Sequence, residues 1–177
     1  HGTITKEPRV LIMQSVQVTG EGRKLLADLA TIDLAQNNSV QQVHATGHVR
    51  MGDSGGMQVR SPKAELTLGA NNSMESAQFS GGVDFESSKQ DAGGHSGEML
   101  MRFAPTTKAN STSAQLQTIH ARQGVTLRRS PQEKGKNPQA FSLTSDAMTF
   151  ALKDVRLLSS AQTESPGPVT LTTAQNK

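Results

Sequence analysis

A pattern that repeats after 34 residues constrains the fold of this chain more than any other feature. Residues 45–49 read Ala-Thr-Gly-His-Val, and residues 79–83 read Phe-Ser-Gly-Gly-Val. The same offset places 30–34 (ATIDL) on 64–68 (AELTL). We infer that one structural unit is written at least twice in the sequence.

Apolar and polar residues alternate along most of the chain, which is typical of strands with one buried and one solvated face. Residues 43–51 and 77–85 show this alternation most clearly. Turn-forming residues separate such runs at 19–22, 36–39, 51–56, 69–73, 89–94 and 131–138. The pattern predicts ten or more short strands joined by tight turns, in an all-β sandwich, jelly roll or β-solenoid.

The segment 21–34 also fits a helix, because Leu25 and Leu29 belong to an apolar stripe of helical period. The repeat decides between the two interpretations. It places Asp28 on Pro62, and a proline at that point would remove a backbone donor and clash inside a helix. We therefore predict that both copies are extended.

Gly47 and Gly81 occupy equivalent positions in the two copies. A glycine inside a strand marks a bulge, a bend or the close approach of another backbone. We interpret both as bends where a sheet folds over on itself. A strand glycine without a special role is the alternative.

Composition limits the core and the partners. Of 177 residues, 33% are hydrophobic and 3% aromatic, which favours a thin core of aliphatic residues and Met. The net charge of +3 divides into −3 over residues 1–100 and +6 over 101–177. This imbalance is too mild for a nucleic-acid binder and weakly favours an anionic partner. Cysteine is absent, which is compatible with an oxidising periplasm.

His44 and His48 are the first candidates for a metal site. Four residues span roughly 13 Å along a strand, so these two side chains cannot share one metal there. We expect both to face solvent. No metal and no cofactor are predicted.

No arrangement of residues in the sequence favours catalysis. Residues 53–56 (DSGG) lack the strand-turn-helix context of a nucleophile elbow or a phosphate loop, and a hairpin turn explains them. Asp28 and Asp33, like Asp84 and Glu86, alternate with apolar residues and are expected to face solvent. We therefore do not expect an enzyme.

Two features favour a lipid ligand. Met51, Met57, Met99 and Met101 are flexible enough to pack against acyl chains, although ordinary core filling explains any one of them. The basic segment 127–136 fits acidic headgroups, or it is a solvated hairpin loop.

The succession of Val43 to Met51 (VHATGHVRM), Gly56 to Leu66 (GMQVRSPKAEL) and Ala77 to Val83 (AQFSGGV) resembles the OstA-like/LptC family of periplasmic lipopolysaccharide-export proteins. The resemblance covers about residues 16–127. One departure is that Leu66, and Ile32 in the first copy, stand where that family commonly has an aromatic residue.

The resemblance implies a twisted, partly open β-jelly roll of folded-over antiparallel sheets in residues 1–160. For residues 161–177 the alternatives are a final strand and a flexible tail, and the polar composition favours the tail. The groove between the sheets would shield lipid acyl chains without any covalent chemistry. The residues expected to line it, or to fill a closed core, are Val16, Val18, Ile32, Leu34, Val43, Val49, Val59, Leu66, Leu68, Phe79, Val83, Phe85, Met99, Met101, Phe103, Ile119, Val125 and Leu127.

The resemblance also implies partners. They are lipopolysaccharide or a similar acylated glycolipid, other jelly-roll proteins stacked edge to edge, further copies of this chain and an inner-membrane ABC transporter that supplies the energy. We expect free sheet edges near residues 10–18 and 141–152. The chain is expected to be the periplasmic, soluble part of a longer precursor. The alternative function is a structural β-solenoid or self-assembling scaffold.

Overall fold

The computed structural model describes residues 2–6, 9–20, 22–69, 72–89, 91–104, 114–129, 140–153, 157–163 and 169–173. These residues form eleven β-strands and no α-helix, which confirms the prediction of an all-β chain. The strands are β1 (Gly2–Lys6), β2 (Arg9–Gly20), β3 (Arg23–Leu34), β4 (Val40–Asp53), β5 (Met57–Leu68), β6 (Met74–Ser87), β7 (Ala92–Ala104), β8 (Gln115–Arg129), β9 (Phe141–Lys153), β10 (Leu157–Thr163) and β11 (Thr170–Thr173).

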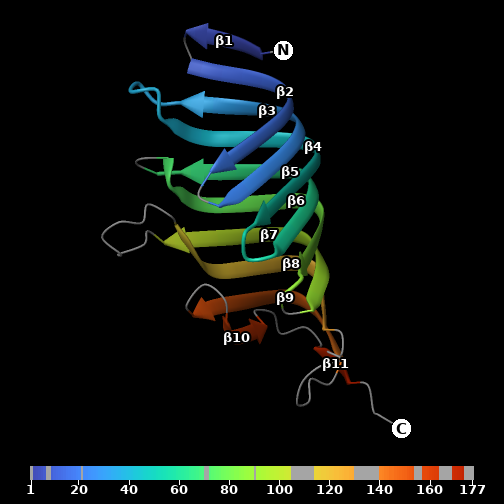
Figure 1. Ribbon diagram of the computed structural model, residues 1–177. Helices are drawn as coiled ribbons and strands as arrows, with labels where there is room; N and C mark the ends of the chain where they lie inside the picture. The colour runs from blue at the N-terminus through green and yellow to red at the C-terminus, as the bar shows by residue number, and fades with distance from the viewer. Residues whose placement is uncertain are drawn as a thin grey trace.

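All eleven strands belong to one open sheet. Consecutive strands from β1 to β10 pair antiparallel, and β11 pairs antiparallel with β9. Figure 1 shows the strands stacked in chain order from β1 to β9. The segment 23–34 is strand β3, as the repeat predicted, and not a helix. Strands β2 to β9 are not short, because each runs through a bend and spans 12 to 15 residues.

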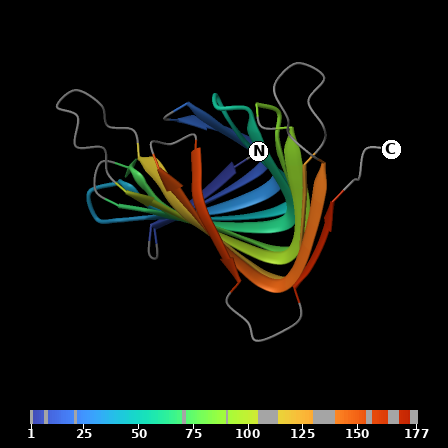
Figure 2. The ribbon, with the colours of Figure 1, turned by 90° about the horizontal axis from the view of Figure 1, so that it is seen from below.

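Each strand from β3 to β9 bends near its middle. The register shifts there between every two neighbouring strands, as at Thr46/Val49 and Ser80/Val83. Such β-bulges bend a strand and increase its twist. Because the bulges lie at the same level in every strand, the sheet folds over along one line, and Figure 2 shows the two halves facing each other across it.

The two halves are called wall A and wall B. Wall A contains the strand segments 16–20, 23–27, 49–53, 57–61, 83–87, 92–96, 125–129 and 141–145. Wall B contains the segments 29–34, 40–46, 63–68, 74–80, 98–104, 115–122 and 147–153.

The glycines singled out in the repeat lie on the bend. Gly47 and Gly81 have φ angles of +76° and +88°, a region that L side chains rarely adopt. A Cβ on Gly47 would lie 2.8 Å from the Asp28 Cβ, which is a clash, and one on Gly81 would lie 3.3 Å from the Pro62 Cγ, which is a tight contact. The prediction of bends at both glycines is confirmed.

Two rows of inward-facing side chains flank the line of bulges, and together they are called the crease. In wall A they are Val16, Ala27, Val49, Ser61, Val83, Ser96, Val125 and Ser145, and in wall B they are Ala30, Ala45, Ala64, Phe79, Met99, Ala121 and Met148. Every one of them is at most 7% exposed. In wall A each valine pairs with an alanine or serine of the next strand, and the small partner suits the narrow angle where the walls meet.

The ends of the sheet differ from the prediction. The expected edge at residues 10–18 is covered for part of its length, because β1 pairs with residues 9–13 of β2. The expected edge at 141–152 is covered by two short strands: β11 pairs with residues 141–144 of β9, and β10 pairs with 148–153. The domain boundary expected at residue 160 therefore falls inside β10, and part of the expected tail forms β11.

Candidate functional site

The two walls enclose a cavity of about 600 Å³. Wall A contributes residues of β3 to β9, and wall B contributes residues of β7, β8 and β9. The lining residues are Arg23, Met51, Gly52, Asp53, Gly55, Met57, Val59, Phe85, Glu86, Ser87, Lys89, Ala92, Met99, Met101, Phe103, Leu116, Ile119, Leu127, Arg129, Phe141, Phe150 and Leu152. These residues are called the mouth, and only Met99 belongs to the crease as well.

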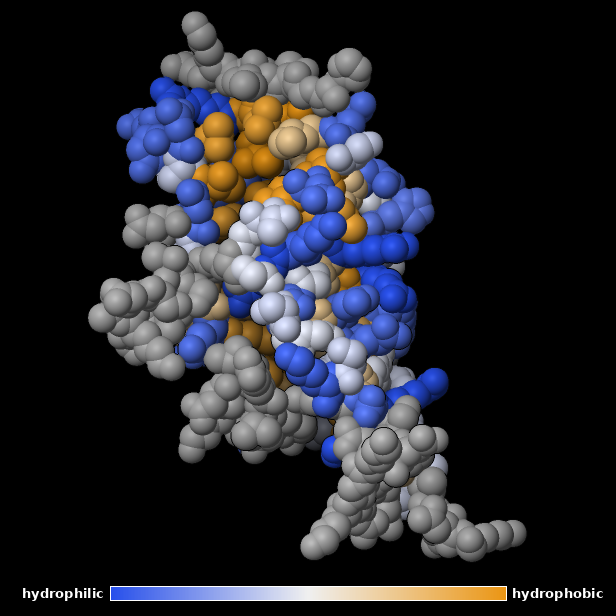
Figure 3. Space-filling model, in the orientation of Figure 1, coloured by the Kyte–Doolittle hydropathy of each residue, from blue (hydrophilic) through white to orange (hydrophobic). Residues whose placement is uncertain are grey.

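Large, flexible or aromatic apolar side chains dominate the mouth. All four methionines that the sequence singled out line it, together with the phenylalanines of β6, β7 and β9. Met99 and Met101 are fully buried, whereas Phe85 and Leu127 are half-buried. Figure 3 shows hydrophobic residues along this side of the folded sheet, in a strip over the N-terminal strands and in smaller patches farther down.

Charged residues of the mouth come mainly from wall A, near its hairpin ends. The Asp53 Oδ1 accepts a hydrogen bond from the Met57 amide at 2.9 Å. Glu86 forms an ion pair with Arg60 at 3.6 Å. The Lys89 Nζ donates a long hydrogen bond of 3.4 Å to the Ser54 carbonyl. Both carboxylates are thus engaged by neighbouring residues of wall A.

Arg23 connects the two walls. It lies at the start of β3 in wall A, and its Nη2 donates a 2.6 Å hydrogen bond to the carbonyl of Ala114, just before β8. Its guanidinium also lies over the Phe103 ring of wall B, 4.6 Å from the ring centroid. This contact joins residues 91 positions apart in sequence and bounds the cavity on one side.

The structure separates the eighteen residues predicted to line a groove or core. Val59, Phe85, Met99, Met101, Phe103, Ile119 and Leu127 line the cavity. Val16, Ile32, Val43, Val49, Leu66, Phe79, Val83 and Val125 are buried in the core outside it, and Leu34 and Leu68 are half-buried against that core. Val18 is 39% exposed, and it lies in the part of β2 that β1, paired with residues 9–13, does not cover.

Several mouth residues were not predicted. Phe141, Phe150 and Leu152 belong to β9, whose inward parity changes across the bulge between Ser145 and Ala147. Apolar and polar residues alternate over 141–145 and again over 148–152, and this alternation could have indicated that Phe141, Phe150 and Leu152 face inward. Arg23 and Arg129 gave no such indication, since an arginine at the end of a strand usually faces solvent.

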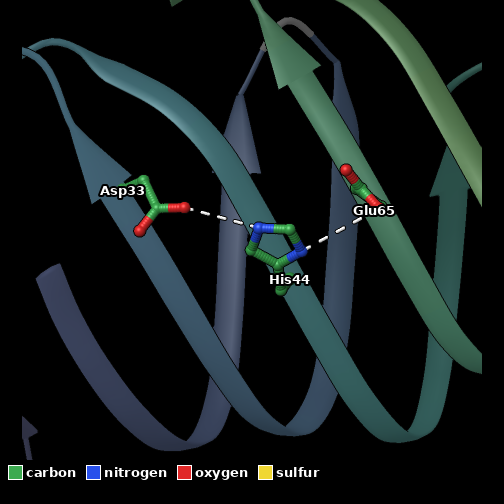
Figure 4. A network of polar contacts seen from close by, with 3 residues as sticks. All are labelled: Asp33, His44 and Glu65. Carbon is green, nitrogen blue, oxygen red and sulfur yellow. Dashed lines mark ion pairs between the residues drawn. The ribbon is translucent and has the colours of Figure 1, made fainter.

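Histidines and carboxylates lie on the outer face of the sheet. Figure 4 shows His44 between two acidic residues of neighbouring strands, with its Nε2 3.4 Å from Asp33 and its Nδ1 4.0 Å from Glu65. His48 pairs separately with Asp28 at 2.7 Å. These side chains are between 36% and 85% exposed, so each pair contributes little to stability.

His95 likewise pairs with a carboxylate and lies 2.9 Å from Asp84. Asp28, Asp33, Asp84 and Glu86 each have a side chain at least 36% exposed. In the described part of the chain, no group of three potential ligands is arranged to hold a metal ion. The histidines named here therefore form surface pairs with carboxylates, and His44 contacts two of them.

Comparison with known proteins identifies no relative: no family model matches the sequence, and neither a curated protein nor a solved structure matches it significantly. Among the described residues, no helix is long and apolar enough to cross a bilayer. The folded sheet and its cavity are therefore the features that indicate a function.

Proposed function

We propose that this protein is a non-enzymatic, lipid-binding component of lipopolysaccharide transport across the periplasm to the outer membrane. The acyl chains would occupy the cavity between the two walls, while sugars and phosphates stay at its rim. In this proposal the folded sheet is a partly open β-jelly roll of the OstA-like/LptC kind, which the sequence resembles over about residues 16–127.

The observation that carries the proposal is the apolar cavity. Its volume of about 600 Å³ is in the range of small-ligand sites, and Met and Phe side chains supply most of its apolar lining. Each methylene that leaves water for such a site gains about 0.8 kcal/mol. Methionines adapt to irregular apolar partners, which suits acyl chains of variable length.

The open ends of the sheet support the proposed partners. β1 and the short strands β10 and β11 terminate the pairing, and an unpaired edge is a template for strand addition. Other jelly-roll proteins of a transport bridge, or further copies of this chain, would stack there so that one cavity continues into the next. An inner-membrane ABC transporter would supply the direction, because a passive cavity has none.

The alternative is a self-assembling scaffold. The repeated strand pairs and open ends favour it, because identical units stack on one another. Every pairing in the described sheet is antiparallel, however, and a coil of stacked parallel strands is not what these residues form. A scaffold does not require a ligand in the cavity, so the presence of a bound lipid there distinguishes the two functions.

Photo-crosslinking in cells tests the proposal. A photoreactive residue replaces Phe85 or Leu127, which are half-buried and line the cavity, and outward-facing Gln78 or Arg128 serves as the control. Leu127 and Arg128 are adjacent, so this pair differs only in the face of the sheet. We expect lipopolysaccharide adducts at Phe85 and Leu127 and none at the controls. Adducts at no position in folded protein would favour the scaffold.

A further inference from the structure

Arg129 differs from the other charged residues of the mouth. It is the last residue of β8 and lies on the inner face of wall A, paired in register with Ala92 on one side and Phe141 on the other. All three residues line the cavity. Its register neighbours on the two adjacent strands are therefore an alanine and a phenylalanine, and neither is acidic.

The Nε of Arg129 is buried and has no hydrogen-bond partner in the part of the chain that the structure describes. A buried donor without an acceptor is costly, because water no longer satisfies it. The acidic residues of the mouth do not meet this need, since Glu86 pairs with Arg60 and Asp53 binds the Met57 amide.

We propose that Arg129 binds the phosphate of a phosphorylated lipid whose acyl chain fills the cavity. This inference rests on the proposed lipid-binding function and adds the chemistry of the headgroup. A guanidinium presents N–H donors in a planar fork that matches two phosphate oxygens, and it is less strongly hydrated than an ammonium group. The chain of the ligand would then extend from Arg129 toward Met99 and Met101, which line the same cavity.

Isothermal titration calorimetry of the full chain tests this with three probes, each below its critical micelle concentration where it has one. Dodecyl phosphate has both the chain and the anion, dodecyl maltoside has the same chain with a neutral head, and inorganic phosphate has the anion alone. We expect dodecyl phosphate to bind at least about tenfold more tightly than dodecyl maltoside, as for a hydrogen-bonded charge. Inorganic phosphate should bind far more weakly than either.

Variants assign the preference to Arg129. Arg129→Gln should weaken dodecyl phosphate at least about tenfold and leave dodecyl maltoside unchanged. Arg129→Lys keeps the charge without the fork and should give an intermediate affinity. Arg50→Gln removes the same charge from an exposed position of β4 outside the cavity and should change neither. Circular dichroism and thermal unfolding check that each variant is folded.

The outcomes separate this inference from the proposed function. If Arg129→Gln weakens both amphiphiles equally, or neither, the headgroup assignment is wrong. If inorganic phosphate binds as tightly as dodecyl phosphate, the site is for a free anion and not for a lipid. If dodecyl maltoside binds but dodecyl phosphate binds no better, lipid binding stands and the phosphate contact falls. If neither amphiphile binds, both proposals fail.

Discussion

The crease and the mouth are built from the same strands but have opposite characters. In the crease, each valine of wall A pairs with a small residue of the next strand, and every side chain is at most 7% exposed. In the mouth, long and aromatic side chains such as Met101 and Phe103 leave about 600 Å³ between the walls. One folded sheet thus combines a tightly packed hinge line with an open apolar cavity.

The difference has a geometric cause. Walls that meet at a bend approach most closely beside it and diverge with distance from it, as Figure 2 shows. Side chains beside the bulges are buried, whereas those two or more positions farther along the strand line the cavity. Changes in the mouth should therefore affect ligand binding, and changes in the crease should affect folding.

The largest expected effect comes from truncating an aromatic side chain in each region. Phe79→Ala, in the crease, should lower the free energy of unfolding by about 3–5 kcal/mol, because a fully buried ring leaves a cavity. Phe85→Ala, in the mouth, should cost about 1–2 kcal/mol, because that ring is only half-buried. Urea unfolding measures both. Equal losses would show that the mouth is packed as tightly as the crease.

The bend itself gives the next effect. Gly81→Ala should lower the free energy of unfolding by about 2 kcal/mol, because an L side chain is strained at φ +88° and its Cβ would press on Pro62. Gly124→Ala, with φ +75° and nothing within 4 Å, should cost only the conformational part, about 1 kcal/mol. A Gly124 variant that is less stable than the Gly81 variant would contradict the role of the Pro62 contact.

Removing the connection across the mouth should have a smaller effect. Arg23→Met eliminates the hydrogen bond to Ala114 and the contact with Phe103, and we expect a loss of about 1.5 kcal/mol in the free energy of unfolding. Lys24→Met, at the exposed neighbouring position, should change it by less than about 0.5 kcal/mol. Indistinguishable values for the two variants would mean that Arg23 does not hold the walls together.

Truncating two serines of the crease should change the free energy of unfolding least, and the two changes should have opposite signs. Among the described residues, no group hydrogen-bonds the buried Ser96 Oγ, so Ser96→Ala should raise the free energy of unfolding by about 1 kcal/mol. The Ser145 Oγ donates to the Ala147 carbonyl at 3.1 Å, so Ser145→Ala should lower it by about 1 kcal/mol. Thermal unfolding of both variants measures these two changes in stability. A destabilised Ser96 variant would show that this hydroxyl has an acceptor after all.

Three residues of the apolar alternation show what the sequence predicts and what it leaves open. Phe79, Val83 and Met101 have equivalent positions in the apolar alternation, and all three are fully buried. Only Met101 lines the cavity, whereas Phe79 and Val83 flank the bulges. Parity states which side of a sheet a residue faces, but it contains no information about how far the opposite wall lies from it.

By itself, the sequence determined the local features of this protein. Alternation places side chains on two faces, turn residues end the hairpins, and a glycine tolerates the positive φ of a bulge, so the strands and the bends at Gly47 and Gly81 followed from it. Only the tertiary structure decided what depends on distant segments. The Arg23 contact with Ala114 spans 91 residues, and the cavity exists because segments remote in sequence face each other across the bend.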